Sequence, residues 1–148
     1  MVGAWLSPPE GLVNPNGYFT VIGFGSLVDP KSAAETMPNL RNFRTGIVQN
    51  FCRVFNLVSI INIKRGFAQE PYLATCTAVR RDDSTLLVCL FDVPFSEYEA
   101  FARREVRLRH EVIEFNEAND SPGHRLGKGI LCTAFSDEEY FVQRCQAD

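Results

Sequence analysis

The spacing of apolar residues changes several times along the chain and predicts more strands than helices. Residues 19–23 form an apolar run of strand type, and the β-branched, partly alternating segment 43–64 predicts two strands with a break near Asn56. Two further apolar runs, 72–81 and 85–93, flank Asp82-Asp83-Ser84, a pattern typical of a β-hairpin. Later strands are predicted in the sequences "LRHEVIEF" and "ILCTAFS".

Three segments have helical character. The segment "DPKSAAETMPN" predicts a short helix with Asp29 as N-cap, Pro30 at its first position and Pro38 at its end. Helical spacing returns in "SEYEAFARREVR", where Ser96 and Glu99 have the spacing of a capping box. The last helix is predicted in "DEEYFVQRC", and the polar segments "KRGFAQEP" and "NEANDSPGHRLGKG" are predicted loops.

Together these elements indicate an α+β fold or a small mixed β-barrel with flanking helices packed outside it. Residues 1–17 hold three prolines and three glycines, which predicts an irregular N-terminal lead-in. The length of 148 residues suits one domain, which we place at residues 18–148.

Composition and charge narrow the classes of partner. The net charge of -3 gives no basic field that would attract nucleic acid, and no apolar run approaches the roughly 20 residues that cross a membrane. Five cysteines without a CxxC spacing are typical of reduced thiols in a cytoplasmic protein, and two histidines make a metal site improbable. We expect no cofactor and leave the oligomeric state open.

Glu105 is unusual because helical spacing places it on the apolar face of its helix, beside Phe101 and Ala102. Burial would raise the pKa of this carboxyl group toward neutrality, as suits a general acid or base. Two structural alternatives remain: Glu105 pairs with a buried arginine, or the helix ends before it. The arginines and glutamates around it predict a solvated face.

The second unusual feature is the sequence "GFGSL" at residues 23–27, directly after the first strand. Glycines leave the backbone amides open to a ligand, and such a loop before a helix suits a carboxylate or phosphate. The sequence lacks the third glycine of a dinucleotide fingerprint and the G-x-S-x-G order of a nucleophile elbow. An anion-binding loop and a simple tight turn both remain open.

The order of these features resembles the gamma-glutamylcyclotransferase-like family, over residues from about 18 to about 135. That family carries a Tyr-Gly-Ser-Leu type of loop after its first strand and a glutamate after a segment like "LFDV". The resemblance implies a mixed barrel in which the loop holds the γ-glutamyl part of a small-molecule substrate; the matching residues are Gly23, Phe24, Gly25, Ser26 and Leu27. It implies that Glu105 is the catalytic acid or base.

The implied reaction is a cyclisation, in which the α-amine of the substrate attacks its own γ-carbonyl group and releases 5-oxoproline. The chain departs from the family at three positions. Phe24 and Leu108 stand where tyrosines are common, and Cys89 stands near a common glycine. These departures leave the identity of the substrate open.

Two other hypotheses compete with a cyclotransferase. The same scaffold could serve as a non-catalytic module that binds a carboxylate or another partner. A hydrolase with Ser26 as nucleophile would need His110 or His124 as its base, and both histidines are more typical of surface positions. Arg53 could pair with Glu105, with a substrate carboxylate or with a structural partner.

Overall fold

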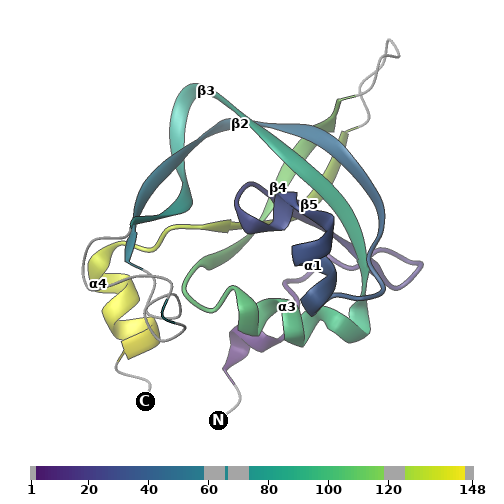
Figure 1. Cartoon of the computed structure of the whole chain (residues 1–148), viewed down its shortest axis with the longest axis horizontal. Coiled ribbons are helices and arrows are strands. Elements are labelled where there is room, and N and C mark those ends of the chain that lie inside the picture. The colour runs from purple at the N-terminus through teal and green to yellow at the C-terminus, as the bar shows by residue number, and fades with distance from the viewer. Residues whose placement is uncertain (1–2, 59–65, 67–73, 119–125, 146–148) are drawn as a thin grey trace.

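The computed structural model describes residues 3–58, 66, 74–118 and 126–145. Five strands form a closed barrel in the order β1-β3-β2-β4-β5, shown in Figure 1. Their bounds are Tyr18–Gly23 for β1, Arg41–Val58 for β2, Ala74–Pro94 for β3, Arg109–Glu117 for β4 and Leu126–Thr133 for β5. Strand β1 is antiparallel to β3 and parallel to β5, so the barrel is mixed, as the sequence predicted.

Short helices flank the barrel. The α-helices are α1 (Pro30–Thr36), α3 (Tyr98–Arg104) and α4 (Asp137–Tyr140), and α4 continues as a π-helical turn, η4 (Phe141–Cys145). The 3-10 turns are η1 (Ala4–Leu6), η2 (Ser26–Val28) and η3 (Phe95–Glu97). Helices α1 and α3 contact each other on one side of the barrel (Figure 1). None of the helices in the described ranges is long and apolar enough to span a membrane.

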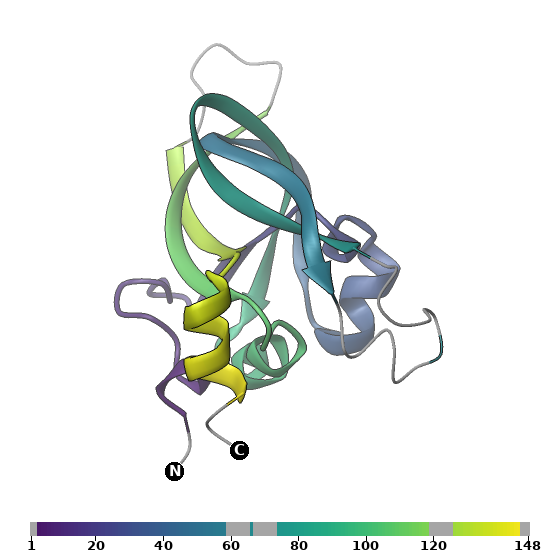
Figure 2. The same cartoon turned by 90° about the vertical axis from the view of Figure 1, so that its left-hand side faces the viewer.

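The predicted break near Asn56 is wrong, because β2 is one strand of 18 residues. The register between β2 and β3 shifts between Phe55 and Leu57, so the polar residue marks a β-bulge and not the end of a strand. Figure 2 shows the resulting long β2–β3 ribbon, which curls over the barrel.

The hairpin predicted at Asp82-Asp83-Ser84 is also wrong, since β3 runs through these residues. Asn50 in β2 and Asp83 in β3 both adopt positive φ, at 63° and 60°, and the amide of Asp83 donates a hydrogen bond of 3.2 Å to Asn50 Oδ1. Asn and Asp tolerate this left-handed conformation better than other side chains. The turn-type residues therefore bend two paired strands at the same level and do not reverse the chain.

The predicted helix at 29–39 is confirmed: Asp29 accepts a hydrogen bond from the amide of Lys31, and Pro30 occupies the first turn. The capping box predicted at Ser96 and Glu99 is wrong, because the turn η3 occupies 95–97 and Glu97 is the N-cap of α3. A capping box forms instead between Ser136 and Glu139 at the start of α4.

The other predicted segments agree in part. Strand β4 matches "LRHEVIEF" closely, whereas β5 begins at Leu126, within the segment predicted as a polar loop. Residues 119–125 of that segment lie outside the described residues, as does "KRGFAQEP" apart from Gly66.

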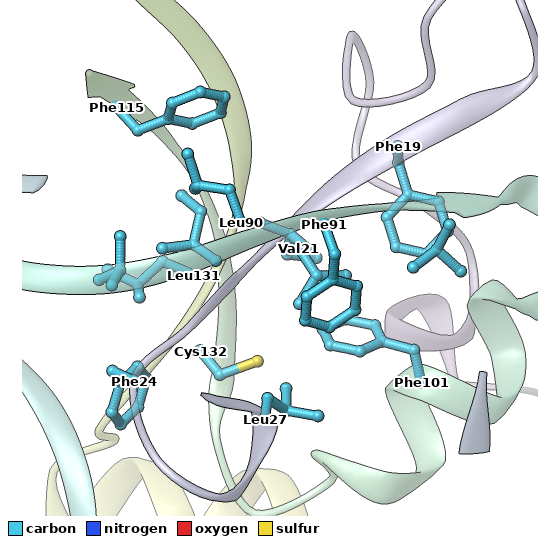
Figure 3. Packing of buried hydrophobic residues seen from close by; sticks show 14 of the residues in the cluster. Phe19, Val21, Phe24, Leu27, Leu90, Phe91, Phe101, Phe115, Leu131 and Cys132 are labelled. Atoms are coloured by element: carbon cyan, nitrogen blue, oxygen red, sulfur yellow. The ribbon is translucent and has the colours of Figure 1, made fainter. Parts of the chain in front are cut away.

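The hydrophobic core joins the helices to the outer face of the barrel. The ring of Phe19 in β1 lies 5.3 Å from that of Tyr98 and 5.9 Å from that of Phe101, both on α3. Figure 3 shows Phe19, Val21 and Phe91 on the side of the strands that faces Phe101. This packing fixes α3 against β1, and it thereby fixes the residues that follow α3 relative to the loop that follows β1.

Candidate functional site

The loop after β1 turns sharply because glycine occupies position 23. A Cβ atom built at Gly23 would lie 3.0 Å from the Cβ of Leu27 and 3.2 Å from its backbone, so a larger residue would require Leu27 to move by a few tenths of an ångström. A Cβ atom at Gly25 would meet no atom within 4 Å. Close packing against Leu27 therefore favours glycine at position 23. At position 25 a side chain would have space, so the glycine there leaves the loop backbone accessible.

Two arginines hold this loop from outside. Arg53 in β2 donates from Nε to the carbonyl oxygen of Phe24 at 3.0 Å, and Arg104 donates from Nη2 to Ser26 Oγ at 3.1 Å. Arg53 also donates to the carbonyl oxygen of Leu87 at 3.4 Å. Of the roles open to Arg53 in the sequence, these contacts support a structural one.

Glu105 is buried, with 8% of its surface exposed, although it does not lie within the helix as predicted. Helix α3 ends at Arg104, and Glu105 is its C-cap, with its amide donating to the carbonyl oxygen of Phe101. The short connection from Glu105 to β4, and not a helical face, turns the carboxyl group into the protein. His110 holds this connection, since its Nε2 lies 2.9 Å from the carbonyl oxygen of Glu105.

The electrostatic setting of Glu105 raises its pKa. Desolvation by burial is the largest cause, and the positive charges of Arg104 and Arg107 oppose it in part. The carboxyl group therefore holds its proton at a higher pH than a solvent-exposed glutamate does. A group of this kind can accept and return a proton near neutral pH.

Arg104 links the acid to the loop, a role that the sequence did not predict. Besides its bond to Ser26 it donates to Ser32 and Thr36 of α1, and its Nε lies 3.6 Å from Glu105 Oε1. The neighbouring Arg103 behaves as predicted, because it forms an exposed ion pair with Glu99. Helical spacing could not distinguish the two arginines, since the partners of Arg104 lie about 70 to 80 positions earlier in the chain.

A cavity of about 300 Å³ brings the loop and the acid together. All five predicted loop residues and Glu105 contribute to its wall. The other lining residues are Ile22, Leu57, Thr75, Cys76, Arg107, Leu108 and Cys132. Figure 3 shows Cys132 beside the loop that carries Phe24 and Leu27. The volume lies at the lower end of the range of small-molecule sites.

The two cysteines of this cavity are free thiols with raised pKa values. Burial is the main cause for both, and the negative charge of Glu105 adds to it at Cys132. A raised pKa keeps the thiol protonated and therefore weakly nucleophilic. The arrangement thus favours proton transfer at Glu105 over nucleophilic attack by sulfur.

The residues required by the serine hydrolase hypothesis are not brought together in the described part of the chain. Ser26 Oγ accepts from Arg104, and His110 faces the backbone of Glu105. His124 lies outside the described residues. Within the described ranges, no group of three or more His, Cys, Asp or Glu side chains is placed to hold a metal ion.

Comparison with known proteins shows similarity in structure. No protein-family model matches the chain, and no curated protein matches it in sequence. A solved gamma-glutamyl cyclotransferase aligns with 80% of this chain and 69% of its own, with a TM-score of 0.57 and 14% sequence identity. An uncharacterized protein from Homo sapiens aligns with 81% of this chain and 69% of its own, with a TM-score of 0.58 and 15% identity.

A protein from Arabidopsis thaliana, solved in solution, aligns over a larger part of both chains. The alignment covers 91% of this chain and 85% of the other, with a TM-score of 0.61 and 13% identity. At such low identity these similarities concern the fold. The chain therefore has the gamma-glutamyl cyclotransferase-like fold: a closed mixed barrel of five strands with flanking helices.

Proposed function

We propose that the protein is a γ-glutamyl cyclotransferase-type enzyme, an acyl-transferring catalyst that cyclises a γ-glutamyl compound to 5-oxoproline. The observation that carries this proposal is the shared cavity, in which Glu105 and the loop of residues 23–27 line one wall. The fold also supports this proposal, because a solved gamma-glutamyl cyclotransferase has a similar fold.

In this reaction the α-nitrogen of the substrate forms a bond to the γ-carbonyl carbon, and the bond from that carbon to the leaving nitrogen breaks. The α-ammonium group loses two protons and the leaving nitrogen gains two, so no proton is consumed overall. Glu105 takes one proton from the attacking nitrogen and delivers it to the leaving nitrogen. Its raised pKa suits it to both steps.

The loop supplies the other requirement, stabilisation of the oxyanion that forms at the γ-carbonyl group. The first amides of a helical turn have no acceptor within that turn, which leaves the amides that open η2, those of Ser26 and Leu27, for a ligand. In enzymes that use them, preorganised amides next to a developing negative charge lower the free energy of the transition state by several kcal/mol. Because the substrate provides the nucleophile, no nucleophilic side chain is needed.

We place this reaction in the cytoplasm. Cys52, Cys76, Cys89 and Cys132 are free thiols, which fits a reducing compartment. The 300 Å³ cavity fits a small-molecule substrate, and we propose neither a metal nor a cofactor for the reaction.

The test is release of 5-oxoproline from γ-glutamyl-alanine, γ-glutamyl-ε-lysine and glutathione by the native protein and by Glu105→Gln. We expect turnover of at least one compound and its loss in the Gln variant, with unchanged circular dichroism showing that the fold is intact. Binding of these compounds without turnover would instead support a carboxylate-binding module, and the enzyme proposal would then fail.

A further inference from the structure

One part of the cavity wall comes from the β2–β3 ribbon, apart from the loop and the acid. Leu57 in β2 and Thr75 and Cys76 in β3 form this part. All three are uncharged at neutral pH, because burial raises the pKa of the Cys76 thiol. The proposed reaction assigns the γ-glutamyl group to the loop and to Glu105, so the ribbon is the part of the wall that is open to the rest of the substrate.

Phe55 extends this neutral wall toward solvent. It lies directly opposite Cys76 in the antiparallel pairing of β2 with β3, and residues in such a pair project from the same face of the sheet. Arg53, two positions earlier, shares that face. Its charge acts on Cys76, and its Nε donates to the carbonyl oxygen of Phe24 in the loop. Phe55 is therefore on the face of the ribbon that meets the cavity and its loop.

The ring of Phe55 is unusually open to water. Its exposed fraction is 68%, compared with 53% for Phe95 and 55% for Phe141. A single exposed apolar residue is ordinary on a protein surface, but this one is paired with a residue of the cavity wall. A ligand that emerges from the cavity over this ring gains free energy by removing apolar surface from water.

The chemistry of the cyclisation says which part of the substrate emerges. The α-nitrogen reaches the γ-carbon of the same group, so the γ-glutamyl part closes into a compact five-membered ring. The leaving group is attached to that γ-carbon and projects away from the ring. When the ring lies between the loop and Glu105, the leaving group extends along the remaining wall, which the ribbon supplies.

We infer that Phe55 contacts the leaving group of the substrate and makes the enzyme prefer leaving amines that carry an aliphatic or aromatic group. This inference rests on the proposed function and adds a residue that determines specificity. A charged leaving group gains no ionic partner from Phe55 or from the three neutral wall residues, whereas an apolar one buries its surface against them.

The test compares γ-glutamyl-ethylamide with γ-glutamyl-phenethylamide, whose leaving groups are both primary alkyl amines and differ by an aromatic ring. The native protein should have a kcat/KM about 5- to 20-fold higher for the phenethylamide. Phe55→Thr should remove most of this preference and leave kcat/KM for the ethylamide unchanged. Threonine suits the strand and removes the ring, so the fold should persist.

Phe95→Thr is the matched control, because Phe95 is also an exposed phenylalanine but lies in η3. It should keep the native preference. Phe55→Leu keeps an apolar side chain and should retain part of the preference. Equal turnover of the two compounds by the native protein would overturn the inference and leave the proposed function intact. A full preference in Phe55→Thr, or an equal loss for both compounds, would also overturn it.

Binding separates this inference from the proposed function. Calorimetry measures the affinity of γ-glutamyl-phenethylamide for Glu105→Gln and for the double variant that also carries Phe55→Thr. If the native protein turns over neither compound but the double variant binds about 5- to 20-fold more weakly, the cyclotransferase proposal fails and the contact with Phe55 stands. Equal binding by the two variants, or no binding by Glu105→Gln, would overturn the contact.

A second copy of the chain is the other occupant to test. Sedimentation velocity of the native protein and of Phe55→Thr over a range of concentrations tests this alternative. We expect the same sedimentation coefficient for both proteins. Self-association that Phe55→Thr abolishes would place the ring in an interface between two copies and overturn the inference.

Discussion

Two clusters centred on arginine differ in ways that indicate which one is the better candidate for chemistry. Arg44 in β2 pairs with Asp92 at 3.3 Å and with Glu117 at 2.7 Å. At the end of α3, Arg104 joins Glu105 to the loop. Both clusters join segments that are distant in sequence, and both are largely withdrawn from solvent.

The partners of the two clusters differ. Asp92 accepts hydrogen bonds from Thr20, Asn42 and Arg44, so neighbouring side chains use its oxygens. Among the described residues, Glu105 forms an ion pair with Arg104 at 3.6 Å, its pKa is raised by burial although the charges of Arg104 and Arg107 oppose this in part, and it lines a cavity. A satisfied ion network stabilises a fold, whereas a costly carboxyl group in a cavity is typical of a catalytic site.

The largest expected effect comes from exchanging each acid for its amide. Glu105→Gln should lower turnover by about 10²- to 10⁴-fold, the usual contribution of a general acid or base, without loss of stability. Asp92→Asn should leave turnover of the folded protein unchanged and lower the free energy of unfolding by about 1–3 kcal/mol, because the new amide NH₂ meets donors. Parallel assays of 5-oxoproline release and urea denaturation measure both. The opposite pattern would exchange the roles of the two clusters.

Removal of the central arginine sharpens the contrast in stability. Arg44→Met leaves Asp92 and Glu117 without their cation, with side chains that are only 17% and 16% exposed. We expect a loss of about 2–3 kcal/mol in the free energy of unfolding, somewhat less than for a fully buried pair. Arg103→Met, which breaks an exposed pair, should change it by less than about 0.5 kcal/mol. Equal losses in the two variants would contradict the structural role of the Arg44 cluster.

The fold class could be predicted from the sequence, but the paths of the individual strands could not. The order of predicted strands and helices indicated an α+β fold or a mixed barrel, and the family resemblance favoured the barrel. Asn50, Asn56 and Asp82-Asp83-Ser84, however, have the same local signature in a turn and in a bulge. Only the pairing of β2 with β3 over their whole length decides between these alternatives. Such pairing is a tertiary interaction that no local window contains.

The candidate site shows the same limit. The burial of Glu105 was predicted from helical spacing, although a C-cap position and a short connection produce it. Arg104 is one of the arginines that the sequence predicts on a solvated face, because helical spacing contains no information about its partners Ser26 and α1. The loop residues were recognisable because a glycine packed against Leu27 leaves a mark in the sequence itself.

The pH dependence of stability tests the raised pKa of Glu105. The folded protein keeps a proton on Glu105 over a pH range in which the unfolded chain has lost it. The stability that this proton contributes is full below the ordinary carboxyl pKa and is lost as the pH rises through the higher folded-state pKa. Glu105→Gln stays neutral, so its stability relative to the native protein should rise with pH, by about 1.4 kcal/mol for each unit of pKa shift.

Urea denaturation of both proteins between pH 4 and pH 8 measures this difference. Asp92→Asn, compared with the native protein in the same way, serves as the control from the Arg44 cluster. A stability difference for Glu105→Gln that stays constant, or that falls as the pH rises, would contradict a buried acid with a raised pKa.

A smaller effect is expected when lysine replaces Arg104, because lysine keeps the positive charge but lacks the planar guanidinium group. Its guanidinium group reaches Ser26, Ser32 and Thr36 at once, which the single ammonium group of lysine cannot do. Arg104→Lys should therefore lower kcat/KM about 10-fold through a looser loop. The same exchange at Arg103, which forms an exposed ion pair with Glu99, should leave kcat/KM unchanged. Kinetics of 5-oxoproline release on one substrate compare the two.

The smallest expected effect is that of Ser26→Ala. In a cyclisation the substrate supplies the nucleophile, so the hydroxyl group serves to hold the loop through Arg104 and to line the cavity. We expect a loss of only a few-fold in kcat/KM, which corresponds to one hydrogen bond at a solvent-exposed site. A nucleophilic serine would instead cost several orders of magnitude. A loss of that size, with accumulation of an acyl-enzyme detected by mass spectrometry, would move the chemistry from Glu105 to the loop.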